Sequence, residues 1–238
     1  MSMPINTIEA GRFRIPVLLL DNHLLGIVKP QNMPVQRDSS GDLDVLTASK
    51  SFVGQTFHKP GAVYMGLVHR LDRPVGGCMI LARTSKAAAR LSQTFSAHDA
   101  LKIYLCVLRG HLDQPLTLSD WLLKNEHTGS SCVVPENTPG AKLARLITEP
   151  IAHRDGLTLA RVTLLTGRSH QIRVQHQHAA LPLWGDARYG RGKPGEQIAL
   201  WAHELTFPHP TTRVPITLTS FPPPSGAFAL FAESLNES

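Results

Sequence analysis

The fold is organised around one stretch, Gly66-Leu67-Val68-His69-Arg70-Leu71-Asp72-Arg73-Pro74-Val75-Gly76-Gly77-Cys78-Met79-Ile80-Leu81-Ala82-Arg83. Its two apolar segments, residues 65–68 and 78–82, have the length and the Gly/Pro boundaries of buried strands. Pro74 cannot donate a hydrogen bond to a sheet, and Gly76-Gly77 permits backbone conformations that are closed to other residues. We therefore expect two strands with a fixed polar loop between them.

The loop holds one carboxylate, Asp72, between Arg70 and Arg73. Neighbouring guanidinium charge favours the ionised acid, which suits nucleophilic or electrostatic catalysis. An aspartate close before a proline also commonly forms a turn with its own backbone, and flanking arginines are often only solvated. Both interpretations stay open here, and the loop alone favours the structural one.

Composition indicates a folded protein with an anionic partner. The 238 residues suffice for one large domain or two small ones, and 42% are hydrophobic while 18% are charged. This balance excludes a chain that is disordered through excess charge. The formal net charge of +6 favours a polyanionic partner, nucleic acid before membrane.

The three cysteines, Cys78, Cys106 and Cys132, are odd in number and widely spaced. They match neither a disulfide framework nor a CxxC metal site, and they fit a reducing compartment. No apolar run approaches the roughly 18 residues of a membrane span, and the N-terminus lacks the apolar stretch of a signal peptide. We expect a soluble, cytoplasmic protein that does not act at a membrane.

Short apolar runs bounded by turn formers predict further strands over residues 16–20, 24–28, 101–108, 143–151, 157–165, 198–207 and 214–221. Capping residues and apolar periodicity predict helices over 45–52 after Asp44, 86–97 after Thr84-Ser85, 170–180 after Ser169, and 228–235. Residues 1–15 are expected to be an irregular lead-in, and 110–142 a long irregular excursion. The pattern predicts an α+β fold, with one domain over 16–238, a mainly antiparallel mixed sheet, a few flanking helices and long loops.

The twelve histidines raise the possibility of a metal site, above all His170, His176 and His178. Their spacing matches no HExxH motif, and no cysteine lies nearby. Histidines interleaved with lysine and arginine on a polar helix face are more simply a phosphate-facing surface. We expect no metal.

Taken in order, the polar motifs resemble the RluA family of RNA pseudouridine synthases, over about residues 16–223. The motifs are Val28-Lys29-Pro30, the His69-Arg70-Leu71-Asp72 loop, Lys102-Ile103-Tyr104, Thr166-Gly167-Arg168-Ser169-His170-Gln171-Ile172-Arg173, Gly185-Asp186 with Tyr189-Gly190, and His203-Glu204-Leu205 with Phe207 before His209-Pro210. HRLD alone is a weak signal, whereas the ordered set is strong. The resemblance implies the pseudouridine synthase fold.

The resemblance also implies site residues. Asp72 matches the catalytic aspartate, which either attacks the ribose C1′ of a target uridine or assists removal of a ribose proton. Tyr104 matches the tyrosine that packs on the base and takes or relays the C5 proton, and Arg173 matches the arginine that pairs with the aspartate. Arg70 resembles the residue that contacts RNA where the target base leaves the stack. The expected RNA-binding residues are His69, Arg70, Arg73, Lys102, Arg168 and His170.

The family chemistry needs no metal or organic cofactor, and we expect a monomer acting on a tRNA or a ribosomal RNA hairpin. Where most relatives have Thr-Ser-Gly after HRLD, this chain has Pro74-Val75-Gly76-Gly77. Because the pattern begins by residue 16, we expect a short form without the S4-like RNA-binding domain of many relatives. The alternatives are a non-catalytic RNA-binding or RNA chaperone protein, and a hydrolase that pairs Asp72 with His69, a pairing that adjacent side-chain directions disfavour.

Overall fold

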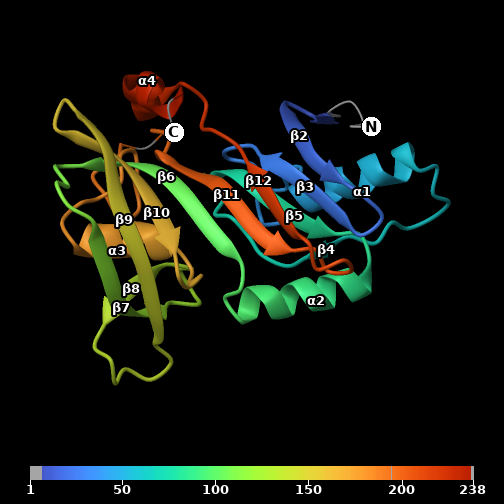
Figure 1. Cartoon of the computed structure of the whole chain (residues 1–238), viewed down its shortest axis with the longest axis horizontal. Helices are drawn as coiled ribbons and strands as arrows, with labels where there is room; N and C mark the ends of the chain where they lie inside the picture. Colours follow the sequence, from blue (N-terminus) through green and yellow to red (C-terminus); the bar gives the residue numbers. More distant parts are fainter. Residues whose placement is uncertain (1–6, 194, 237–238) are drawn as a thin grey trace. The chain divides into compact units, whose positions relative to one another are not determined.

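The computed structural model describes residues 7–193 and 195–236 (Figure 1). Its internal contacts divide the chain into two compact units. The first unit consists of the residues up to Ala100 together with Ala202–Ser220, and the second of Leu101–Trp201 together with the segment from Phe221 onward. Both units combine antiparallel strand pairs with helices, which confirms the predicted α+β class.

The first unit is built on strands in the order β1-β2-β3-β5-β11, with β4 paired to β5 and β12 paired to β11. Their bounds are β1 (Thr7–Ala10), β2 (Phe13–Leu20), β3 (Leu24–Lys29), β4 (Gly66–Leu67), β5 (Gly76–Ala82), β11 (Leu200–Pro208) and β12 (Pro215–Thr219). The predicted hairpins of β2 with β3 and of β11 with β12 are confirmed. In the first of them, the Asp21 carboxylate accepts hydrogen bonds from the backbone N–H groups of His23 and Leu24.

The predicted irregular lead-in is wrong for the part that the structure describes. β1 and the beginning of β2 form an antiparallel hairpin in which Ile8 pairs with Ile15. Ile8, Ala10 and Ile15 are buried, so alternate residues of this hairpin join the core. This hairpin has few apolar residues and short strands, so its alternating pattern is weak in the sequence. Residues 1–6 lie outside the described part of the chain.

β5 has a packed layer on each of its faces. Met79 and Leu81 belong to a cluster that includes Val45, Ala48 and Val53 of α1 (Val45–Thr56). Cys78, Ile80 and Ala82 belong to a second cluster with Ala87 and Leu91 of α2 (Ser85–Ser96). Both predicted N-caps are confirmed, because Asp44 accepts from the Thr47 N–H and Thr84 from the Ala87 N–H.

Gly77 marks the place where β5 begins to run beside β11. Its φ of +121° is a conformation that L side chains rarely adopt, and a Cβ there would lie 2.2 Å from the Ala202 carbonyl oxygen. Any side chain would therefore push the two backbones apart. This close approach fixes the strand that follows the Asp72 loop.

The second unit is an antiparallel sheet with the strand order β6-β10-β9-β7-β8. The bounds are β6 (Leu101–Arg109), β7 (Leu116–Lys124), β8 (Ser131–Val134), β9 (Lys142–Arg154) and β10 (Leu157–Leu164). The predicted strand at 101–108 and the hairpin of 143–151 with 157–165 are confirmed. The irregular excursion predicted over 110–142 is wrong, since it contains β7 and β8, which pair with each other, and β7 also pairs with β9.

Three helical segments complete this unit: α3 (Gln171–His178), the 3₁₀ helix η1 (Gly226–Phe231) and α4 (Ala232–Asn236). The last two replace the single helix predicted over 228–235. α3 is buried at six consecutive positions, from Gln171 to His176. It starts one residue later than predicted, because His170, not Ser169, is its N-cap, with a left-handed φ of 55° and no side-chain cap.

Candidate active site

Asp72 lies in the loop that connects β4 to β5 in the first unit. The backbone closes a turn there, because the Val75 N–H donates to the Asp72 carbonyl oxygen at 3.0 Å. The Asp72 side chain is half-buried, while Arg70 is exposed and Leu71 is buried. The loop therefore anchors itself through Leu71 and presents the polar residues on either side of it.

A lysine that sequence reasoning left without a role supports this loop. Lys29, at the end of β3, is fully buried, and its Nζ donates to the carbonyl oxygens of Pro30 (2.8 Å), Met33 (2.7 Å) and Arg73 (3.0 Å). Burial lowers the pKa of Lys29 to about 7, although the negative charge of Asp72 acts to raise it. One ammonium group thus joins β3, the following loop and the Asp72 loop. The only signal for it was the short Val28-Lys29-Pro30 motif.

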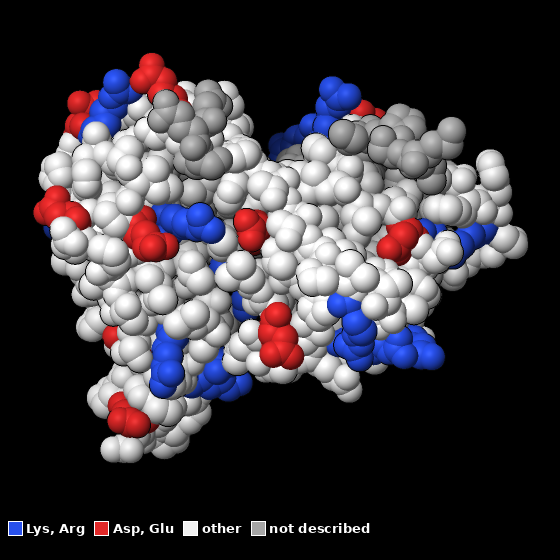
Figure 2. Space-filling view, viewed as in Figure 1, with Lys and Arg blue, Asp and Glu red and all other residues white. Residues whose placement is uncertain are grey.

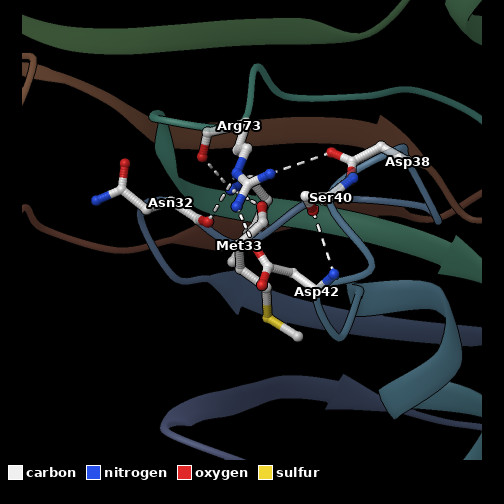
Figure 3. Close-up of polar contacts among 7 residues, drawn as sticks. Asn32, Met33, Asp38, Ser40, Asp42 and Arg73 are labelled. Carbon is white, nitrogen blue, oxygen red and sulfur yellow. Dashed lines mark hydrogen bonds and ion pairs between the residues drawn. The ribbon is translucent and has the colours of Figure 1, made fainter.

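Arg73 connects the same loop to residues 31–44 (Figure 3). Its Nε donates to the Asn32 carbonyl oxygen at 3.3 Å, and its Nη atoms form ion pairs with Asp38 and Asp42, the first at 3.3 Å. All three ionic side chains are about two-fifths exposed. These contacts give Arg73 a role in shaping the loop, and its predicted contact with RNA stays a prediction.

His69 is held inside the first unit by its ring. The Nε2 atom accepts a hydrogen bond from the Ile80 N–H at 3.0 Å, and the ring stacks on Phe95, with 4.8 Å between centroids. An Nε2 that accepts a hydrogen bond carries no proton, so this nitrogen is not available as a general acid. The arrangement speaks against the hydrolase alternative, which needs His69 as the acid–base partner of Asp72.

Tyr104 and Lys102 lie two residues apart on β6 in the second unit and so share one face of the strand. Tyr104 pairs with Val162 of β10, which pairs with Thr148 of β9. The Thr148 hydroxyl lies 2.9 Å from Nε2 of His176 on α3. Tyr104 and Lys102 are therefore on the face of this sheet that α3 covers, and both are half-buried.

Arg173 is held by a carboxylate from the loop after α3. Its Nε and Nη2 each donate to an oxygen of Asp186 at 2.8 Å, and the two side chains are 8% and 1% exposed. The guanidinium also lies 5.1 Å from the centre of the Tyr189 ring. A bidentate contact of this kind fixes the orientation of the guanidinium plane. The pairing of Arg173 with Asp72, which belongs to the other unit, stays a prediction.

Asp186 is the second functional candidate that received no role from the sequence, although Gly185-Asp186 is one of the motifs. Burial acts to raise its pKa, but the hydrogen bonds and charge of Arg173 and the N–H groups of Tyr189 and Arg188 outweigh burial and lower the pKa of Asp186. Gly185 has a φ of +70°, and a Cβ there would meet the Gln197 carbonyl oxygen at 2.4 Å. The turn that presents Asp186 therefore requires glycine.

The residues at the start of α3 are also committed to local contacts. His170 Nδ1 lies 2.7 Å from the Tyr189 hydroxyl, which accepts a hydrogen bond from the Ser131 N–H at 2.8 Å. His176 is fully buried between the Thr148 hydroxyl and the Ile172 carbonyl oxygen. The prediction of a phosphate-facing histidine surface is therefore wrong for His176. Burial lowers its pKa to about 4.

Within the described ranges, no group of three or more His, Cys, Asp or Glu side chains is arranged to hold a metal ion. Cys78 and Cys106 are buried, and burial raises the pKa of both thiols, that of Cys78 to about 11.

None of the helices in residues 7–193 and 195–236 is long and apolar enough to cross a membrane. On the face drawn in Figure 2, basic and acidic side chains alternate rather than form one continuous patch.

The sequence-predicted residues fall into two groups. His69, Arg70, Asp72 and Arg73 occupy one loop of the first unit. In the second unit, Lys102 and Tyr104 come from β6, Arg168 and His170 from the turn before α3, and Arg173 from α3. Lys29 holds the loop of the first group through the Arg73 carbonyl oxygen, and Asp186 holds Arg173 of the second group. Each group is therefore held in place by one buried charged residue.

Comparisons with known proteins identify several relatives of this chain. In Vibrio cholerae, ribosomal large subunit pseudouridine synthase C is 30% identical over 81% of this chain, which spans 61% of that protein. An uncharacterised RNA pseudouridine synthase of Zymomonas mobilis is 35% identical over 79% of this chain and 85% of its own length. The tRNA pseudouridine synthase C of Vibrio cholerae is 27% identical, with coverages of 86% and 89%.

Among solved structures, human RNA pseudouridylate synthase domain containing 4 has a TM-score of 0.75 at 18% identity and covers 92% of both chains. Human RNA pseudouridylate synthase domain containing 1 has a TM-score of 0.69 at 21% identity, with coverages of 94% and 95%. These likenesses confirm the predicted fold. The sequence profile of the RNA pseudouridylate synthases matches residues 23–178, a range that contains the Asp72 loop, β6 and α3. The chain belongs to the RNA pseudouridylate synthase family.

Proposed function

We propose that this protein isomerises uridine to pseudouridine in a structured RNA, with Asp72 as the catalytic carboxylate. The observation that carries the proposal is the membership of the family, with the HRLD loop inside the matched range. The support of that loop by the buried Lys29 agrees with it, since a catalytic group has to be held in place.

The reaction breaks the bond between N1 of uracil and C1′ of ribose and forms a bond between C5 and C1′. Asp72 either attacks C1′ or assists removal of a ribose proton, and both routes release the uracil so that it can turn. N1 gains a proton and C5 loses one, and Tyr104 takes or relays the C5 proton. In this proposal Arg173 pairs with the Asp72 carboxylate and orients it. No metal or organic cofactor takes part.

The target base has to leave its stack before these groups can reach it. Arg70 is exposed on the Asp72 loop and suits a contact with the RNA at the vacated position. The names of the relatives include synthases for tRNA and for ribosomal RNA. We propose a tRNA or a ribosomal RNA hairpin as the substrate and a monomeric cytoplasmic enzyme.

The test is pseudouridine mapping on total RNA from a host that lacks the protein. Sites lost in the deletion should return with the wild-type protein and not with Asp72→Asn, which preserves the size of the side chain and removes its charge. Arg161→Met is a matched control, because Arg161 is exposed on β10 and belongs to neither group of site residues. Restoration by both the wild type and Asp72→Asn would refute the role of Asp72. An unchanged map in the deletion would favour a non-catalytic RNA-binding or RNA chaperone protein.

A further inference from the structure

Lys102 is a half-buried lysine that has no hydrogen-bond acceptor in residues 7–193 and 195–236. Among the described residues, no carboxylate or other hydrogen-bond acceptor pairs with its ammonium group. The Nζ atom lies 3.6 Å from the position that a Cβ of Gly167 would occupy, so it rests against the turn before α3. Buried ammonium groups ordinarily have such partners, because the loss of water has to be compensated. The side chain is therefore placed for an anion that is not part of this chain.

A second cation lies beside it. The charge of Arg168 acts on Lys102 and, after burial, is the second cause that lowers the pKa of that lysine. The Arg168 Nε donates to the Leu143 carbonyl oxygen at 2.9 Å, and its backbone N–H donates to Gln171 Oε1 at 2.9 Å. Within the described residues its Nη atoms have no acceptor. The guanidinium is thus fixed at one end and offers its other end to a ligand.

Two like charges held together at a partly buried place repel each other, and a bound anion removes this cost. A phosphodiester has two non-bridging oxygens, so that one can accept from the ammonium and the other from the guanidinium. Gly167 has no side chain, and a Cβ there would lie 3.6 Å from the Lys102 Nζ, so the glycine leaves space beside the ammonium group. We infer that Lys102, Arg168 and the turn at Gly167 form a clamp for a single phosphodiester of the RNA substrate.

This inference rests on the proposed function, because it takes RNA as the ligand. It adds that the two cations act on one phosphate rather than on two. Lys102 shares its strand face with Tyr104, so the clamped phosphate lies next to the residue proposed to contact the base. The clamp is a positioning device for the backbone and takes no part in bond breaking.

The experiment measures the binding of an unmodified tRNA transcript over a series of salt concentrations, by fluorescence anisotropy. Each phosphate contact contributes about 0.7 to the slope of log K against log salt for a single strand and about 0.9 for a B-form duplex. Lys102→Met and Arg168→Met should each lower the slope by about that amount and weaken binding roughly fivefold at 0.15 M salt. The double variant should lose no more slope than either single one.

Arg161→Met is the matched control, because Arg161 pairs with Leu105 and so lies on the opposite face of the sheet from Tyr104. It should keep the wild-type slope. If Arg168→Met does not fold, Arg168→Lys can replace it. This variant keeps the positive charge but loses the planar guanidinium group, so it should bind the RNA more weakly with little change of the salt slope. Unchanged slopes in Lys102→Met and Arg168→Met, or additive losses in the double variant, would overturn the clamp. Binding that persists without turnover would overturn only the proposed function.

Discussion

Around Asp72, a buried ammonium group holds backbone carbonyl groups, whereas around Arg173 a buried carboxylate holds the functional side chain itself. Lys29 donates to three carbonyl oxygens and leaves Asp72 half-buried on its loop. Asp186 binds Arg173 through two hydrogen bonds, and both side chains are almost completely buried. The first arrangement fixes the backbone of a loop, and the second fixes the orientation of one guanidinium group.

These two arrangements should differ in their effect on stability, because a buried ion that loses its partner keeps the free-energy cost of its removal from water. The Arg173–Asp186 pair should therefore dominate the stability of its surroundings, while the ion pairs of Arg73 should contribute little.

The largest effect on stability is expected from Arg173→Met. The variant leaves the Asp186 carboxylate buried without its cation, and we expect a loss of about 3–5 kcal/mol in the free energy of unfolding, measured in urea. Arg173→Met combined with Asp186→Asn should recover part of this loss, since neither buried charge then remains. A loss below about 1 kcal/mol in the single variant would show that the pair is not a main support of α3 and the loop that follows it.

The second effect is a dependence on pH that arises from His176. Its pKa is lowered from 6.5 to about 4, so the unfolded chain binds this proton more tightly than the folded chain. The contribution of His176 to stability is complete above about pH 6.5 and is lost as the pH falls toward 4, to a total of about 3 kcal/mol. His176→Gln should remove this part of the acid destabilisation. Identical pH profiles for the variant and the wild type would contradict it.

Lys29→Met comes next. Three carbonyl groups lose their donor, and we expect a loss of roughly 2 kcal/mol at pH 7 together with lower activity, because the Asp72 loop loses its support. The pKa of Lys29 is lowered from 10.5 to about 7, so the unfolded chain binds more protons between these values. The contribution of Lys29 therefore increases as the pH rises through this window. Urea unfolding at pH 7, 8 and 9 should show a growing gap between wild type and variant, and a constant gap would refute the assignment.

Arg73→Met should have the smallest effect. Its ion pairs with Asp38 and Asp42 are partly exposed to water, and the urea midpoint should stay within the error of the measurement. Amide exchange over residues 38–42 should nevertheless become faster, since these pairs fasten that loop (Figure 3). A clear fall of the midpoint would mean that the first unit, too, depends on its ionic contacts.

Much of the fold could be predicted because local patterns and tertiary packing agree. Asp44 and Thr84 cap their helices as expected, and the apolar run 78–82 is buried on both of its faces. β7 was missed because the neighbouring turn formers obscured its signal. From Leu116 to Ser119 half-buried and exposed residues alternate. The sequence Leu-Thr-Leu-Ser has the same alternation of apolar and polar residues, but it is too short to predict a strand.

The polar supports were harder to predict, because their partners are distant in the sequence or belong to the backbone. Lys29 contacts Arg73 across 44 positions, and its acceptors are carbonyl groups, which leave no mark in the residue types. The left-handed His170 replaces Ser169 as the cap of α3, while Gln171 bonds back to the N–H of Arg168 and the hydroxyl of Thr166. Such a loop is determined by tertiary contacts rather than by the capping preference of one residue.

The most direct test of the account is tritium release from RNA labelled at uridine C5, with purified protein and an unmodified transcript. Formation of pseudouridine has to remove the hydrogen from C5. The wild type should release tritium, whereas Asp72→Asn should release it at least about a thousandfold more slowly and still fold and bind the RNA. Release by Asp72→Asn at the wild-type rate would contradict the central claim that this carboxylate carries the chemistry.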